Sequence, residues 1–84
     1  MFVEELPERI AVIEKAIEEQ DIAEVGRLAH QLKGAAGSYG FPTITDAAKL
    51  LDASVKAGEE LEIVAQQAAA LGDLCGRARA TATA

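Results

Sequence analysis

Apolar side chains recur at steps of three and four residues in four separate stretches of the chain. The first two stretches have their apolar positions at Leu6, Ile10, Ile13 and Ile17, and then at Ile22, Val25, Ala29, Leu32 and Ala36. The third and fourth have them at Ile44, Ala47 or Ala48, Leu51 and Val55, and then at Leu61, Val64, Ala68, Leu71, Cys75 and Ala78. This spacing is typical of an amphipathic helix that buries one face, whereas a half-buried strand would alternate. Four helices are therefore predicted.

Residues that favour helix starts lie at the head of these stretches. Pro7 suits an early position of the first helix, where its missing N–H is no loss. Asp21 followed by Glu24 predicts an N-cap and capping box for the second helix. Thr43 or Thr45 is expected to cap the third helix.

Glycine marks the expected ends of the second and third helices. Gly40-Phe41-Pro42 ends the second, and Gly58 suits a C-terminal cap of the third. Because all three connections are short, neighbouring helices must be antiparallel. We therefore predict an all-α, antiparallel up-and-down four-helix bundle that forms a single domain over residues 1–84, in which the tail Ala80–Ala84 is expected to fray.

Composition narrows the possible classes of protein. The chain has 84 residues, of which 50% are hydrophobic, and its formal net charge is −6. Such a surface repels nucleic-acid backbones and anionic lipid. With one Tyr, two Phe and no Trp, the chain also offers no platform for base stacking. We therefore expect no nucleic-acid partner. We also expect a monomer, although the composition leaves the oligomeric state open.

The sequence shows no feature of a secreted or membrane-spanning protein. The single cysteine, Cys75, cannot form an internal disulfide, and on its apolar seam we expect it to be a packed hydrophobe. The start Met1-Phe2-Val3-Glu4-Glu5 lacks the basic residues and apolar run of a signal peptide. No apolar stretch approaches the roughly 18 residues that span a bilayer. We expect a cytoplasmic location without membrane insertion.

His30 breaks the pattern of the second helix. On a helical wheel it lies roughly 120° from the centre of the apolar face, so we expect the imidazole at the surface. Two cations, Arg27 and Lys33, lie three residues to either side of it. Three glycines lie four or seven residues away on the same helix, namely Gly26, Gly34 and Gly37.

These glycines cost helix stability, at about 0.8–1 kcal/mol each relative to alanine. For Gly26 and Gly37, which fall near the edge of the apolar stripe, close packing between helices explains the missing side chain as well as access to His30 does. Gly34 differs, because it lies roughly 160° from the core direction, where no helix of the bundle need press on it. Its missing side chain mainly exposes His30.

The sequence lacks the residues that His30 would need for a metal site, for nucleophilic catalysis or for ATP binding. One histidine, one cysteine on an apolar seam and scattered carboxylates do not supply the ligands of a metal site. Ser38 and Ser54 cannot be arranged with His30 as a nucleophile, a base and an orienting group. The glycines between positions 34 and 40 follow a helix and not a strand, so no ATP-binding loop is predicted.

An exposed imidazole beside an ammonium group suits phosphoryl transfer. The ring offers an unprotonated nitrogen near neutral pH. A phosphoryl group on that nitrogen brings close to two negative charges, and Lys33 can offset one of them through a charge-assisted hydrogen bond. The missing glycine side chains leave room for a partner's carboxylate to reach the phosphorus in line.

The stretch Ala29-His30-Gln31-Leu32-Lys33-Gly34-Ala35-Ala36-Gly37-Ser38-Tyr39-Gly40 closely resembles the signature of the histidine-containing phosphotransfer (HPt) domains of multistep phosphorelays. The match includes the His-x-Leu-Lys-Gly core and the glycine six residues beyond it. The resemblance implies that His30 is phosphorylated on Nε2, that Lys33 steadies the phosphoryl group and that Gly34 keeps the surface open for a receiver domain. Gly37 and Arg27 are expected to support docking. The resemblance also implies that the protein carries phosphate and has no autokinase activity.

One position departs from the family. In many relatives a glutamine on the following helix contacts the imidazole, and by spacing its nearest equivalent here is Asp52, on a polar stripe with Lys49 and Lys56. An aspartate there either accepts a hydrogen bond from the other ring nitrogen, which fixes the tautomer, or repels the incoming phosphate. A solvated helix face is the simpler interpretation of Asp52 and Lys56.

Three interpretations of the function follow. In the first, His30 carries a phosphoryl group between aspartates, and the partners are response-regulator receiver domains or a hybrid histidine kinase. The chain then binds no cofactor itself, and Mg²⁺ is supplied on the receiver's side. In the second, the same helical face binds a signalling partner as a scaffold, with no chemistry at His30. A third interpretation, the histidine module of a chemotaxis-type kinase, needs an ATP-binding domain that these residues do not contain.

Overall fold

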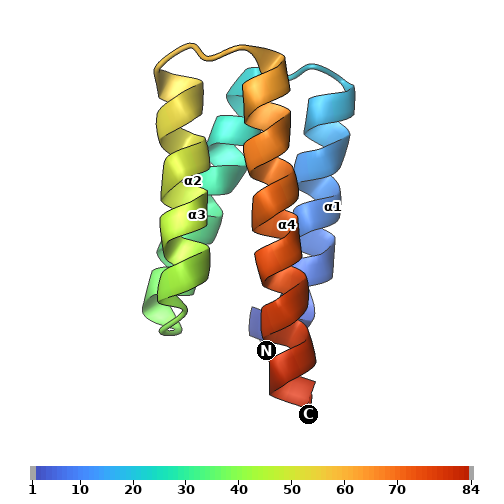
Figure 1. Cartoon of the computed structure of the whole chain (residues 1–84), viewed down its shortest axis with the longest axis vertical. Helices are drawn as coiled ribbons and strands as arrows, with labels where there is room; N and C mark the ends of the chain where they lie inside the picture. Colours follow the sequence, from blue (N-terminus) through green and yellow to red (C-terminus); the bar gives the residue numbers. More distant parts are fainter. Residues whose placement is uncertain (1, 84) are drawn as a thin grey trace.

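Four long helices, joined by short turns, make up the described chain. A computed structural model describes residues 2–83, apart from the side chains of Val3 and of residues 79–83. The helices are α1 (Phe2–Glu18), α2 (Ile22–Ser38), α3 (Pro42–Lys56) and α4 (Leu61–Thr83). Successive helices run in opposite directions, and both ends of the chain lie at the same end of the bundle (Figure 1). The predicted all-α, antiparallel four-helix bundle is confirmed, and residues 2–83 contain no strand.

Each helix buries one face in a common core, as the spacing of apolar residues predicts. The nearly inaccessible members of the four stripes are Leu6, Ile13, Val25, Ala29, Leu32, Ala36, Ile44, Ala48, Leu51, Val64, Ala68, Leu71 and Cys75. Other members pack against this core and are partly exposed, namely Ile10, Ile17, Ile22, Val55 and Ala78. Burial raises the pKa of the Cys75 thiol to about 11, so this side chain is a packed hydrophobe, as predicted.

Aromatic rings close the end of the bundle at which the chain starts. Phe2 is buried and stacks on Tyr39, with ring centroids 5.1 Å apart and an interplanar angle of 8°. Its ring also lies 5.4 Å from that of Phe41. This packing holds the first residues in the helix, so Pro7 lies inside α1 and not at its start. The predicted early position of Pro7 is wrong, and the helix loses one backbone hydrogen bond there.

The N-cap of α2 follows the sequence. Oδ1 of Asp21 accepts a hydrogen bond from the backbone N–H of Glu24 at 3.2 Å, which confirms the N-cap. The predicted capping box is wrong, because the carboxylate of Glu24 pairs with Arg27 and the backbone N–H of Asp21 donates to the carbonyl of Ala16 at 2.8 Å. At the other end the chain turns at Gly40, whose φ of +77° lies in the left-handed region that glycine adopts at least cost.

The start of α3 differs from the prediction. Its N-cap is Phe41, which makes no side-chain cap, and Pro42 occupies the first turn. Thr43 and Thr45 therefore lie inside the helix, and the hydroxyl of Thr45 donates to the backbone carbonyl of Phe41 at 2.9 Å. Proline fixes a helical φ and needs no N–H partner, so it starts the helix before either threonine can cap it. Gly58, with φ +77°, follows the end of α3 as expected.

The last helix reaches beyond the other three at its C-terminal end (Figure 1). α4 continues to Thr83, and Ala84 lies outside the described residues, so the fraying of Ala80–Ala84 stays a prediction. Within residues 2–83 no helix is long and apolar enough to cross a membrane.

Candidate functional site

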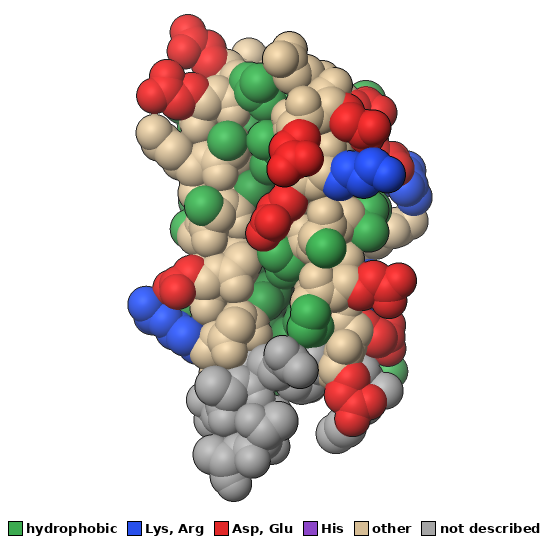
Figure 2. Space-filling model, turned by 90° about the vertical axis from the view of Figure 1, so that its right-hand side faces the viewer, with side chains coloured by type: hydrophobic (Ala, Val, Ile, Leu, Met, Phe, Trp, Pro, Cys, Tyr) green, Lys and Arg blue, Asp and Glu red, His purple; other side chains and the backbone are tan. Residues whose placement is uncertain are grey.

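His30 lies on the outer side of α2. Its neighbours Ala29 and Leu32 are fully buried, whereas the imidazole side chain is 63% exposed. The predicted surface position of the histidine is therefore confirmed. Figure 2 shows the face that lies to the right in Figure 1, where acidic side chains are spread widely and no histidine is visible. The imidazole is thus presented on a different side of the bundle from this acidic face.

A close contact between α2 and α3 sets what lies next to His30. A Cβ added at Gly26 would lie only 2.8 Å from Cγ1 of Val55, so the glycine lets the two helices approach. In antiparallel helices, one turn forward from Gly26 faces one turn back from Val55. These positions are His30 and Asp52, which the contact therefore brings together.

Asp52 stands directly behind the imidazole. Its Oδ2 lies 3.5 Å from Nδ1 of His30, and the side chain of Asp52 is only 6% exposed. The interpretation of Asp52 as part of a solvated helix face is wrong. The same oxygen pairs with two ammonium groups, Nζ of Lys56 at 3.1 Å and Nζ of Lys33 at 3.7 Å. These side chains cover a carboxylate that helical periodicity alone places on a polar stripe.

The ionisation of Asp52 follows from these contacts. Burial raises the pKa of its carboxyl, but hydrogen bonds from Lys56 and His30, together with the charges of Lys56 and Lys33, outweigh burial and lower the pKa below its ordinary value. The carboxylate is therefore charged at neutral pH. Because the imidazole meets an acceptor at Nδ1, the neutral ring favours the tautomer that carries its proton on Nδ1, and in that tautomer the lone pair is on Nε2.

The glycines on the C-terminal side of His30 leave open surface. A Cβ added at Gly34 would meet no atom within 4 Å, and one at Gly37 would meet only Oγ1 of Thr45, at 4.0 Å. Packing thus accounts for the glycine at position 26 but not for those at positions 34 and 37. Because Gly34 and Gly37 have no side chains, a partner protein can approach the imidazole more closely than it could over a helix with side chains at these positions.

A shallow groove runs along the other side of His30, between α2 and α3. It is lined by Ala23, Gly26, Arg27, His30, Gln31, Asp52, Val55 and Lys56. Arg27 reaches this groove while paired with the carboxylate of Glu24, with Nη2 2.7 Å from Oε2. Lys56 is 67% exposed, so Arg27 and Lys56 place two cations in the lining of the groove.

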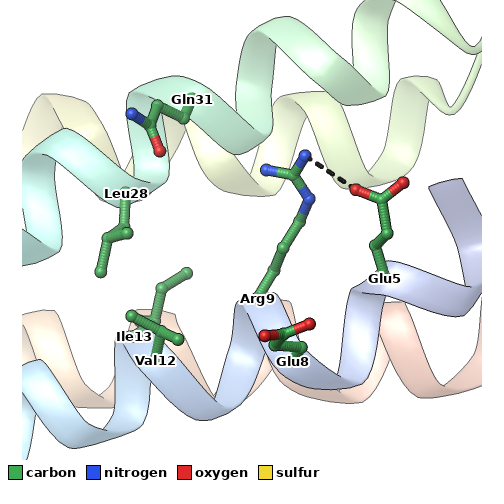
Figure 3. A pocket seen from close by; sticks show the side chains of 7 residues that line it. All are labelled: Glu5, Glu8, Arg9, Val12, Ile13, Leu28 and Gln31. Carbon is green, nitrogen blue, oxygen red and sulfur yellow. Dashed lines mark hydrogen bonds and ion pairs between the residues drawn. The ribbon is translucent and has the colours of Figure 1, made fainter.

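A second hollow lies between α1 and α2, next to Gln31 (Figure 3). Val12, Ile13 and Leu28 form its apolar part, and Arg9 pairs with Glu5, four residues away on the same helix, at 3.3 Å. The carboxylate of Glu8 also lines this hollow, which contains no histidine. Among the residues that the structure describes, no three His, Cys, Asp or Glu side chains form a group that could hold a metal ion. We therefore take the imidazole on α2 as the centre of the candidate site.

One comparison with known proteins identifies a family for the chain. A family model described as the Hpt domain matches residues 1–81. The chain belongs to the Hpt domain family. Searches of curated proteins and of solved structures gave no match. Hpt domains are phosphotransfer modules of phosphorelays, which carry phosphoryl groups and interact with receiver and kinase domains.

Within this Hpt domain the structure gathers most of the predicted site residues in one place. His30, Lys33, Asp52 and Lys56 meet around a single carboxylate oxygen. Gly34 and Gly37 border this cluster as open helix surface. The burial of Asp52 was not predicted from the sequence. The signal that could have predicted this burial is the pairing of Gly26 with Val55, because that contact fixes the register of α2 against α3.

Proposed function

We propose that this Hpt domain relays a phosphoryl group between aspartates of receiver domains, with His30 as the residue that carries it. The observation that supports this most is the position of Asp52 at Nδ1 of an imidazole that is 63% exposed. A carboxylate at one ring nitrogen makes the other the nucleophile and leaves it facing solvent.

The transfer can be written as a balanced displacement at phosphorus. The lone pair of Nε2 attacks the phosphorus of an aspartyl phosphate on the receiver, the P–O bond to the aspartate breaks, and the aspartate leaves as a carboxylate. The reverse step returns the group to the aspartate of a second receiver. Mg²⁺ belongs to the receiver's side, and this chain contributes the imidazole, the ammonium of Lys33 and the open surface at Gly34.

Incubation with a panel of receiver domains, each carrying a labelled aspartyl phosphate, tests this proposal. The expected result is label on this chain in an acid-labile, base-stable form, as a phosphohistidine requires, and its loss to a second, unphosphorylated receiver. Absence of label with every receiver would contradict the proposal. It would favour the alternative in which this face binds a signalling partner without chemistry.

A further inference from the structure

One oxygen atom is the centre of the charge cluster on α2 and α3. Oδ2 of Asp52 has three partners, which are Nδ1 of His30 at 3.5 Å, Nζ of Lys33 at 3.7 Å and Nζ of Lys56 at 3.1 Å. The two lysines come from different helices and reach the carboxylate from either side. With the imidazole neutral, two positive charges share one negative charge, which leaves an excess of one positive charge at the surface.

We infer that Asp52 is a positioning residue that holds the ammonium groups of Lys33 and Lys56 beside the imidazole and competes for them with the phosphoryl group on His30. This inference rests on the proposed function, because the competitor is the phosphoryl group itself. In this role Asp52 weakens the hold of the two lysines on the phosphoryl group. The phosphoryl group therefore stays easier to transfer than it would be if both lysines were free to bind it.

The charges and distances support a competition. A phosphoryl group brings about −1.5 to −2 charges and three acceptor oxygens to the same cluster. Lys33 makes the longer of the two lysine contacts with Asp52 and lies one helical turn from His30 on the same helix. Lys33 is therefore expected to move from the carboxylate to the phosphoryl group, while the shorter contact of Lys56 persists.

The consequence is a shorter lifetime for the phosphohistidine. In hydrolysis, a water oxygen attacks the phosphorus, the P–Nε2 bond breaks, inorganic phosphate leaves and the imidazole regains a proton. Each ammonium that remains on Asp52 is unavailable to neutralise the phosphoryl oxygens. Asp52→Asn removes the competing charge and keeps the size of the side chain, so it is expected to slow hydrolysis.

The experiment has a first arm that needs no phosphorylation. The ¹⁵N resonances of the lysine ammonium groups are compared in the unmodified protein, in Asp52→Asn and in the control Asp46→Asn, which removes the same charge from an exposed position of α3. The expected result is a shift of the Lys33 and Lys56 resonances in the Asp52 variant alone. Unchanged resonances would overturn the inference whatever the function of His30.

The second arm measures the phosphohistidine without a receiver. Phosphoramidate supplies the group: the ring nitrogen bonds to phosphorus, the P–N bond of the reagent breaks and ammonia leaves. ³¹P NMR then follows the decay to inorganic phosphate. We expect Asp52→Asn to lengthen the lifetime by about two- to fivefold, the size of one partly exposed ion pair, and Asp46→Asn to leave it unchanged.

A double-mutant cycle shows whether Asp52 acts through the lysines. In a chain that also carries Lys33→Ala and Lys56→Ala, the Asp52→Asn change is expected to have a much smaller effect on the lifetime, because only the contact with Nδ1 of His30 is left to lose. An equal effect in both backgrounds would overturn the competition and assign the effect to the imidazole alone. A chain that takes no label would contradict the proposed function and the competition together, and the first arm would still decide whether Asp52 holds the lysines.

Discussion

Nδ1 of His30 on α2 lies 3.5 Å from Oδ2 of Asp52 on α3, so an exposed imidazole is backed by a buried carboxylate. This relationship links the fold to the chemistry. Close packing at Gly26 brings the two helices together, the carboxylate favours a proton on Nδ1, and the opposite nitrogen is the one that the proposed phosphoryl transfer would use.

Gly34 offers a position at which helix stability and docking have opposite requirements. Gly34→Gln is expected to raise the free energy of unfolding by a few tenths of a kcal/mol to about 1 kcal/mol, because glycine is a poor helix former. It should nevertheless slow phosphotransfer, because the new side chain lies beside His30. Denaturant unfolding and transfer kinetics with a phosphorylated receiver measure the two effects.

A matched control for Gly34 is Gly76 on α4. A Cβ at Gly76 would also meet nothing within 4 Å, so Gly76→Gln should stabilise the protein to a similar extent. Because α4 does not carry the imidazole, transfer should stay at the rate of the unmodified protein. Equal transfer rates for both variants would remove Gly34 from the docking surface.

Gly26 is expected to behave in the opposite way. Gly26→Ala would place a Cβ 2.8 Å from Cγ1 of Val55, and relieving this overlap requires α2 and α3 to move apart. We expect overpacking to cost about 1–3 kcal/mol in the free energy of unfolding, of which the better helix propensity of alanine offsets up to about 1 kcal/mol, so the expected net change is a loss. Thermal or urea unfolding measures it. A variant as stable as the unmodified protein would show that the helices are not held at this contact.

Lys33 is expected to assist the phosphoryl group without being essential. Lys33→Ala should slow phosphorylation of His30 or shorten the lifetime of the phosphohistidine, because one neutralising charge is lost. Rates with a labelled receiver are compared with those of Lys49→Ala, which removes an exposed cation from α3. If the two variants have the same rates, Lys33 takes no part in the mechanism.

Asp52 predicts how stability depends on pH. The pKa of its carboxyl is lower in the folded protein than its ordinary value of 3.8, so the folded state binds fewer protons at this group than the unfolded state does. The stabilisation is therefore present above pH 4 and is lost as the pH falls through 3.8 toward the folded value. In Asp52→Asn the unfolding free energy should decline less over this acidic range. An unchanged decline in that variant, compared with Asp46→Asn, would contradict the ion-pair account.

The helices could be predicted from the sequence because burial of one helix face requires apolar residues at steps of three and four, and this spacing remains visible even where single residues depart from it. The prediction failed at helix starts, whose positions depend on contacts with other residues. Phe2 enters α1 because Tyr39 stacks on it, and Thr43 and Thr45 lose the cap of α3 because Pro42 starts the helix first.

The candidate site was predicted in the same uneven way. His30 and Gly34 could be placed from the wheel of one helix, because exposure depends only on the direction away from the core. Asp52 could not, since its burial depends on the register of α3 against α2 and on the side chains of Lys33 and Lys56 that cover it. Helical periodicity carries no information on either.

The central claim is that His30 accepts the phosphoryl group, and ³¹P NMR of the chain with ¹⁵N-labelled histidine tests it most directly. After incubation with a phosphorylated receiver, we predict one phosphohistidine signal coupled to Nε2 of His30. His30→Gln should lose that signal while its helical circular dichroism and melting temperature stay almost unchanged, because the side chain is largely exposed. A phosphoryl signal that survives in His30→Gln, or none in the unmodified protein with any receiver, would contradict the account.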